Sequence, residues 1–220
     1  WGCLLQKQQT KKLLKEKALE FGVLLDENAL NRFDTYAKLL VEWNEKINVI
    51  SRKDMDAFWV HHVLHSLAIA KVIQFVPGTC IMDVGTGGGF PGIPLAIMFP
   101  DCNFLLVDSI GKKIKVVEGV RDSLGLQNVM ARQTRVETVK EKQDFIVSRA
   151  VTAFPAFVSW VKDKTSKESR NILPNGVLYL KGGDFEEELK PFVGRTTVYN
   201  IPDFFHEEFF ETKKVIHLVL

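Results

Sequence analysis

The stretch Ile81–Pro94, which reads IMDVGTGGGFPGIP, decides the fold of this chain. A short apolar run ends at Asp83-Val84, glycines follow at alternate positions, and an apolar segment compatible with a helix begins near Ile93. Glycine permits a tight turn because positive φ costs it little, and its missing Cβ lets a ligand approach the backbone. The helix that follows leaves N–H groups pointing at the bend. We therefore predict a strand, a ligand-binding turn and a helix at the carboxyl edge of a parallel sheet.

The glycine turn alone does not identify a ligand, and a flexible turn without a ligand is the simplest alternative. A phosphate-binding P-loop needs Gly-Lys-Ser/Thr after its glycines, whereas Phe90-Pro91 follows Gly89 here. Asp108 ends the next apolar run, Phe104–Val107, near the spacing at which dinucleotide-binding folds carry an acidic residue. Its carboxylate could accept hydrogen bonds from the ribose hydroxyls of an adenosine-containing cofactor. The residues thus indicate a nucleoside cofactor and leave nicotinamide and S-adenosylmethionine both open.

The composition is that of an ordinary soluble globular protein. The chain has 220 residues, 46% of them hydrophobic and 25% charged, which suits one domain or one domain with a smaller appendage. We expect no membrane span, because its apolar stretches are too short, and no secretory signal. Three cysteines without a C-x-x-C spacing favour free thiols in a reducing compartment, so we expect a cytoplasmic protein. The net charge of +2 permits a local basic patch but does not by itself indicate nucleic-acid binding.

The hydrophobic period changes along the chain. Before Cys80 the apolar spacing is helical and predicts four helices: Lys7–Phe21, a longer one from an Asp26 cap through Val41, a short one capped by Asp54 and ending near Trp59, and His62–Phe75. After Pro77, short apolar runs alternate with helical segments, as in a parallel sheet with crossover helices. We expect strands at Cys80–Val84, Phe104–Asp108, Val129–Gln133, Phe145–Ser148 and Gly176–Lys181, and helices near Ile93–Phe99, Gly111–Leu124 and Thr152–Lys164. Two last strands, Thr196–Ile201 and Lys214–Leu220, are expected to close one edge as an antiparallel pair.

The carboxyl ends of the five parallel strands offer a set of functional groups. They are Gly85–Phe90, Asp108, Val136-Glu137, Arg149 and Lys181. The backbone of Val136-Glu137 could meet an adenine edge, and Arg149 could contact a phosphate or orient the cofactor. Because these strand ends share one sheet edge, the set is more specific than any single motif.

Two other clusters have competing interpretations. His61, His62 and His65 lie close in sequence, but no further Cys or His group completes a metal site, so we expect structural histidines. Trp43 has the spacing of a core residue. The polar residues near it could contact a ligand or nucleic acid, or only order a loop; they are Asn44, Lys46, Asn48 and Arg52.

The motifs taken together resemble one protein family. The string from Asp83 to Pro94, Asp108-Ser109 with Lys112-Lys113, Ser148-Arg149-Ala150 and Leu180-Lys181-Gly182 closely resemble the RsmG family, also called glucose-inhibited division protein B. Trp43-Asn44 with Asn48, and His62 followed by Ser66-Leu67, resemble its N-terminal signature. The resemblance covers nearly the whole chain. The family commonly has Asp where His65 stands, Arg where Lys214 stands, and Ala or Pro at Gly88, which leaves the roles of His65 and Lys214 open.

This resemblance implies an α/β fold of the class I methyltransferase type. That fold is a Rossmann-like, doubly wound sheet, mostly parallel with an antiparallel C-terminal strand, plus N-terminal helices. We accordingly expect a helical extension over residues 1–76 and a methyltransferase domain over 77–220. Family members use S-adenosylmethionine to methylate N7 of one guanine in a loop of 16S ribosomal RNA. The implied partner is 16S ribosomal RNA or the small ribosomal subunit, and we expect a monomer without a membrane partner.

The resemblance also assigns residues to roles. By matching positions, the cofactor contacts would be Gly85, Gly87, Phe90, Asp108, Val136, Glu137 and Arg149. Candidates for RNA contact are Lys46, Arg52, Arg149 and Lys181. No metal is expected, because no further Cys or His group completes a site with the histidines. No catalytic acid or base is expected either, because guanine N7 carries a lone pair and no proton at neutral pH, so alignment with the methyl carbon is the protein's main task. Two alternatives remain: a nicotinamide-dependent oxidoreductase, and a non-catalytic RNA-binding module with a relic cofactor pocket.

Overall fold

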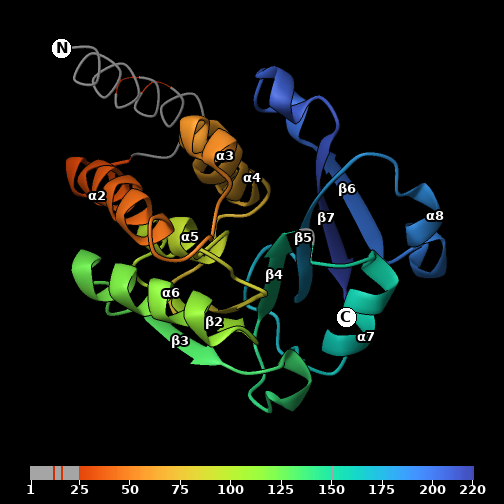
Figure 1. Ribbon diagram of the computed structural model, residues 1–220. Coiled ribbons are helices and arrows are strands. Elements are labelled where there is room, and N and C mark those ends of the chain that lie inside the picture. The colour runs from red at the N-terminus through yellow and green to blue at the C-terminus, as the bar shows by residue number, and fades with distance from the viewer. Residues whose placement is uncertain (1–11, 13–15, 17–24, 150) are drawn as a thin grey trace.

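A seven-stranded sheet with helices on both faces organises the protein (Figure 1). The computed structural model describes residues 12, 16, 25–149 and 151–220. The strand order is β3-β2-β1-β4-β5-β7-β6. The strands are β1 (Cys80–Val84), β2 (Asn103–Asp108), β3 (Val129–Gln133), β4 (Phe145–Arg149), β5 (Gly176–Gly182), β6 (Thr196–Asn200) and β7 (Lys213–Val219).

Strands β1 to β5 are parallel, and β7 runs antiparallel between β5 and β6. Each predicted strand is present to within about a residue at either end. The order reverses at β1, which has β2 on one side and β4 on the other, so the glycine turn leaves the sheet at its topological switch point. The predicted fold class, a mostly parallel doubly wound sheet with an antiparallel C-terminal strand, is confirmed.

Alternate residues of the strands feed two hydrophobic cores. In β1, Ile81 belongs to the core beneath α2, α4, α5 and α6, whereas Met82 belongs to the core beneath α7. The pleat of a strand sends successive side chains to opposite faces, which explains the near-continuous apolar runs that the sequence shows. The helices are α2 (Glu27–Asn44), α3 (Arg52–Asp56), a π-helix (Trp59–Leu64), α4 (His65–Val72), α5 (Gly92–Met98), α6 (Gly111–Leu124), α7 (Phe154–Val161) and α8 (Glu186–Leu189).

Several helix boundaries differ from the sequence predictions. Asp26 caps α2 as predicted, its carboxylate accepting from the Ala29 N–H at 2.7 Å. The prediction that Asp54 caps the next helix is wrong, because the Ser51 hydroxyl accepts from the Asp54 N–H and α3 is already ending at Asp56. The helix predicted over His62–Phe75 begins earlier, as the π-helix, and ends at Val72, since Ile73 is extended. The helix predicted at Lys7–Phe21 lies outside the described residues except for Lys12 and Glu16, which are helical.

The N-terminal helices pack directly on the sheet unit. Helix α2 lies against α5 and α6, and the buried Phe33 and Leu40 share one core with Val117 of α6. The ring of Trp43 lies against Gly119, where a Cβ would come within 2.6 Å of it. A division at residue 76 therefore cuts through a common core, and it remains a proposal about chain organisation.

Two smaller observations complete the fold. Within the described ranges, no helix is both long and apolar enough to cross a bilayer. Cys102 is a buried free thiol and Cys80 a half-buried one, while Cys3 is outside the described residues.

Candidate functional site

The glycine turn is held against the neighbouring strand by its own backbone. The N–H groups of Gly85 and Thr86 both donate to the carbonyl of Val107 in β2, at 2.9 and 3.1 Å. Gly87 follows with a φ of 57°, in the left-handed region. A Cβ built on Gly87 would meet no atom within 4 Å, so the turn presents bare backbone to open space.

Asp108 connects this turn to the loop after β2. Its Oδ2 accepts from the Gly87 N–H at 3.0 Å and its Oδ1 from the Ile110 N–H at 2.9 Å. The side chain is 7% exposed. Each carboxylate oxygen has a second lone pair, so the group can still accept hydrogen bonds from a diol placed above it.

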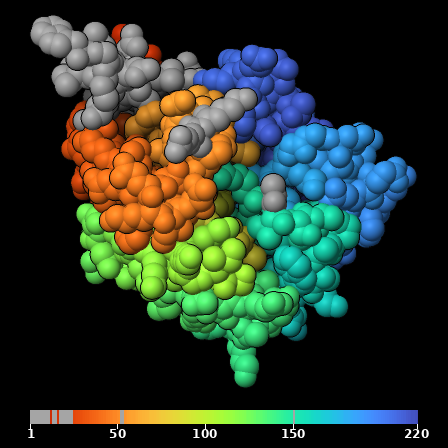
Figure 2. All heavy atoms as spheres, in the orientation of Figure 1, coloured from red at the N-terminus to blue at the C-terminus, as the bar shows by residue number. Residues whose placement is uncertain are grey.

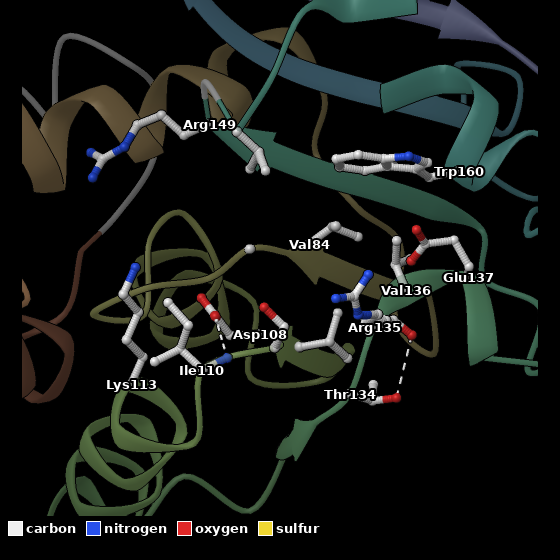
Figure 3. Close-up of a pocket in the computed structure, with 14 residues that line it drawn as sticks. Val84, Asp108, Ile110, Lys113, Thr134, Arg135, Val136, Glu137, Arg149 and Trp160 are labelled. Carbon is white, nitrogen blue, oxygen red and sulfur yellow. Dashed lines mark hydrogen bonds between the residues drawn. The ribbon is translucent and has the colours of Figure 1, made fainter. Parts of the chain in front are cut away.

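A cavity of about 540 Å³ opens at these strand ends (Figure 3). Its lining residues are Val84, Gly85, Val107, Asp108, Ser109, Ile110, Lys113, Thr134, Arg135, Val136, Glu137, Arg149, Val151 and Trp160. The structure thus brings together five of the seven residues predicted to hold a cofactor: Gly85, Asp108, Val136, Glu137 and Arg149. Gly87 and Phe90 are not among the lining residues, and their role as cofactor contacts stays a prediction.

Asp83, which the sequence prediction left out of the site, secures the turn from beneath. Its buried Oδ2 accepts from the Thr86 hydroxyl and from the Gly92 N–H, both at 2.8 Å, and so ties the turn to the start of α5. Among the described residues, Oδ1 has no hydrogen-bond partner. Burial raises the pKa of Asp83 from 3.8 to about 7. Its position at the end of β1 was visible in the sequence, but its burial was not.

Phe90 lies behind the turn rather than in the cavity. Its ring is 3% exposed, stacks on Tyr36 of α2 with centroids 5.3 Å apart, and lies 4.8 Å from the ring of His62. The Tyr36 hydroxyl donates to the Gly88 carbonyl at 2.7 Å. The turn is therefore seated on an aromatic layer supplied by the N-terminal helices.

Arg149 lies between the cavity and the N-terminal helices. It lines the cavity, but its side chain points away from it towards the N-terminal helices (Figure 3). There the guanidinium lies 5.2 Å from the Phe90 ring centroid, and Nη1 donates to the His61 carbonyl at 3.2 Å. Burial lowers the pKa of Arg149. In this conformation the guanidinium ties β4 to the π-helix.

The opposite end of the cavity is formed by the loop after β3. Val136 and Glu137 lie in a short 3-10 helix (Val136–Thr138). The buried Lys164 fixes this loop, its Nζ donating to the carbonyls of Val139 at 2.8 Å and Glu137 at 3.3 Å. Trp160, on α7, adds an aromatic wall that the sequence prediction missed.

The predicted RNA contacts lie apart from the cavity, except Arg149. Lys46 borders a separate hollow of about 670 Å³ at the end of α2, with its Nζ 5.7 Å from the Trp43 ring centroid. Arg52 is the first residue of α3. Lys181 pairs with Glu188 at 3.0 Å, and its side chain is 15% exposed. All of these roles remain predictions.

Asn44, for which ligand contact and loop ordering were both open, orders a loop. Its Oδ1 accepts from the N–H groups of Val49 and Ile50, and its Nδ2 donates to the Ile50 carbonyl at 2.8 Å. The side-chain amide thereby closes the connection between α2 and α3.

The three histidines are packed among aromatic side chains. Burial lowers the pKa of His62 from 6.5 to about 3 and that of His65 well below 6.5. His61 stacks on Phe209 with centroids 3.9 Å apart and contacts Asp54 through Nδ1 at 3.1 Å. Over the described part of the chain, no three His, Cys, Asp or Glu side chains converge as metal ligands.

Comparison with known proteins gives consistent results. The GidB family model, described as rRNA small subunit methyltransferase G, matches residues 29–215. A protein of Flavobacterium johnsoniae named ribosomal RNA small subunit methyltransferase G is 57% identical over 205 residues, which are 93% of this chain and 98% of that protein. A protein of Bacteroides thetaiotaomicron with the same name is 52% identical over 202 residues, 92% of this chain and 98% of its own length.

Solved structures share the fold at low sequence identity. Magnesium protoporphyrin IX methyltransferase from Synechocystis, solved with bound S-adenosylmethionine, aligns with a TM-score of 0.54 at 14% identity, over 90% of this chain and 99% of its own. An S-adenosylmethionine-dependent methyltransferase from Aquifex aeolicus also gives a TM-score of 0.54 at 14% identity, over 78% of this chain and 100% of its own.

Proposed function

We propose that this chain, which belongs to the rRNA small subunit methyltransferase G family, methylates N7 of a guanine in a loop of 16S ribosomal RNA. The methyl donor in this proposal is S-adenosylmethionine. Family membership makes it a methyltransferase acting on RNA of the small ribosomal subunit. One observation supports the choice of cofactor: Gly85, Asp108 and Val136-Glu137, from three strand ends, line a single cavity.

The residues of the cavity fit S-adenosylmethionine. The Asp108 carboxylate has lone pairs for the two ribose hydroxyls, and the backbone at Gly87 can be approached closely, whereas the side chain of Val151 lies against Gly85. The volume of about 540 Å³ lies in the range of small-molecule and cofactor sites. When bound, S-adenosylmethionine supplies an electrophilic methyl carbon on a sulfonium.

The protein's contribution to methyl transfer is mainly one of position. Asp108 and the glycine turn orient the nucleoside end, and the open side of the turn leaves room for a purine to approach in line. Guanine N7 attacks with its own lone pair, so no side chain has to remove a proton. The Asp83 carboxyl is buried and bonded to Thr86 and Gly92, which suits a structural role and not that of a base.

The target guanine has to leave its stack to reach the cavity, which a loop of RNA permits at a lower cost than a duplex. Lys46, Arg52, Arg149 and Lys181 are the side chains that we propose for contact with phosphate or base. For Lys181, that role requires the ion pair with Glu188 to open. We propose that the protein acts as a monomer on 16S ribosomal RNA or on the small subunit.

The decisive experiment is methyl transfer from labelled S-adenosylmethionine to naked 16S RNA, small subunits and assembled ribosomes. Digestion of the RNA to nucleosides should release the label as 7-methylguanosine. Label on another atom would refute the N7 assignment. Salt-dependent RNA binding without transfer to any of the three substrates would favour the non-catalytic module.

A further inference from the structure

Trp160 occupies a position that the proposed function does not yet use. It is a half-buried residue on the last turn of α7 and one of the residues lining the cavity. One side of the indole packs against the core beneath α7, where the Phe157 ring lies with its centroid 6.4 Å away at an angle of 60°. A large aromatic side chain is therefore anchored by the core and also borders a ligand cavity.

Trp160 borders one end of the cavity, together with residues of the loop after β3. Figure 3 shows its indole on one side of the cavity and Arg135 on the other, with Val136 and Glu137 at the same end. Val136 is buried; Ile110, which Figure 3 places beside Lys113 and away from Trp160, is 47% exposed, and Val151, which lies against Gly85, is 39% exposed. Apolar surface left in contact with water at a concave site favours a ligand that covers it.

Polar groups of the loop after β3 also border this end of the cavity. The backbone of Val136-Glu137 lies there. The Nζ of Lys164 holds this loop in place by donating hydrogen bonds to the carbonyls of Glu137 and Val139. Asp108, the group suited to a ribose, lies further along the cavity. A nucleoside with its sugar at Asp108 would direct its base towards Trp160.

We propose that Trp160 is the aromatic wall against which the purine of the cofactor stacks. The inference rests on the proposed function for the identity of the cofactor, and it adds a residue that sets affinity for the nucleoside half. Stacking of a base on an aromatic ring needs no particular hydrogen bonds, so Trp160 contributes affinity while the Val136-Glu137 backbone reads the edge of the base.

The test uses S-adenosylhomocysteine, adenosine and methionine as probes on the full chain. The chain has four tryptophans, so indole fluorescence reports on Trp160 once a matched variant lacks it. In the wild type, S-adenosylhomocysteine and adenosine should change the fluorescence and methionine should not. Trp160→Phe should remove that change while calorimetry still detects binding. The control Trp43→Phe, on the opposite face of the sheet, should keep it.

Affinity provides the second readout. Trp160→Leu should weaken binding of S-adenosylhomocysteine roughly tenfold or more, because the purine would lose its aromatic stacking partner. Trp160→Phe should retain most of the affinity, which separates loss of stacking from loss of folding. Wild-type affinity in Trp160→Leu, or an unchanged fluorescence response in Trp160→Phe, would overturn the inference and leave the proposed function standing. Failure of the wild type to bind S-adenosylhomocysteine would overturn both.

Discussion

The two sides of the glycine turn differ in what lies against them. On the cavity side, a Cβ on Gly87 would meet no atom within 4 Å. On the side facing the N-terminal helices, a Cβ on Gly89 would lie 2.6 Å from Ile93 and 2.7 Å from the Tyr36 hydroxyl. Both glycines have positive φ, 57° and 104°. The turn is thus open at Gly87 and a packing centre at Gly89, and these two glycines are needed for different reasons.

This difference explains how a loop can be rigid and accessible together. The helical side supplies ring stacking between Tyr36 and Phe90 and a hydrogen bond to the Gly88 carbonyl. The cavity side supplies the Asp108 carboxylate as a hydrogen-bond acceptor for the Gly87 N–H. A turn fixed from behind can hold its backbone ready for a ligand without closing the space in front, which lowers the ordering cost of binding.

The largest expected effect comes from adding one methyl group on the packed side. Gly89→Ala should lower the free energy of unfolding by about 2–6 kcal/mol, since it combines backbone strain at positive φ with overpacking against Ile93 and Tyr36. Urea denaturation measures it. Gly87→Ala is the matched control, with left-handed strain of about 1–2 kcal/mol and no clash. If the free energy of unfolding fell equally in the two variants, the tighter packing around Gly89 would make no difference to stability.

The second expected effect is a pH dependence of the free energy of unfolding, caused by the Asp83 carboxyl beneath the turn. Burial raises the pKa of Asp83 from 3.8 to about 7. The folded protein therefore binds this proton more tightly than the unfolded chain, and the contribution of Asp83 to stability should fall as pH rises from about 4 to about 7. The fall is at most about 4 kcal/mol, because one pKa unit corresponds to about 1.4 kcal/mol.

The control for this pH dependence is Asp83→Asn, which cannot titrate. The difference in unfolding free energy between wild type and variant should change over that window and level off above it. A difference that stays constant from pH 4 to 7 would contradict a buried carboxyl with a raised pKa.

A smaller effect should follow from removing one hydroxyl on the packed side. Tyr36→Phe keeps the ring that stacks on Phe90 but leaves the buried Gly88 carbonyl without this donor. The loss in unfolding free energy should be about 1–3 kcal/mol, the cost of an unsatisfied buried acceptor. Thermal and urea unfolding measure it, and unchanged stability would mean that the Gly88 carbonyl finds another donor.

The smallest expected effect is on ligand affinity from the open side. The Asp108→Asn variant has one acceptor oxygen, whereas the two oxygens of Asp108 accept from the N–H groups of Gly87 and Ile110. The variant also lacks the negative charge that would strengthen a hydrogen bond from a ribose hydroxyl. Binding of S-adenosylhomocysteine should weaken by about 1–2 kcal/mol in calorimetry. Full affinity in Asp108→Asn would remove the ribose contact from the proposed site.

The sheet was predictable from the sequence because buried parallel strands leave a simple signal. Cys80–Val84 and Val129–Gln133 were predicted with the bounds that the structure has, and each is a short apolar or β-prone run that ends in polar or glycine residues. Less regular segments were not predictable. The π-helix Trp59–Leu64 and the four-residue α8 have no period of their own, and Ser51 and Asp54 are equally good caps by residue type.

For the site, position along a strand was predictable and side-chain direction was not. Asp108 ends β2 and Val136 follows β3, and both line the cavity, as expected from the shared carboxyl edge. Phe90 follows a strand as well, but only the packing of α2 shows that it faces the helices. Trp160 lies within α7 and reaches the cavity only because of how that helix is oriented on the sheet, which the sequence does not define. Lys181 pairs with Glu188 of α8, a helix that was not predicted.

The contact between Tyr36 and the glycine turn has a consequence for biosynthesis. A ribosome delivers α2 well before Gly88 and the α6 residue Val117, the partners on which its apolar face depends. Until they emerge, Phe33 and Leu40 lack the partners that α6 contributes to their core. Helix α2 therefore cannot complete its packing until the chain has been made as far as α6.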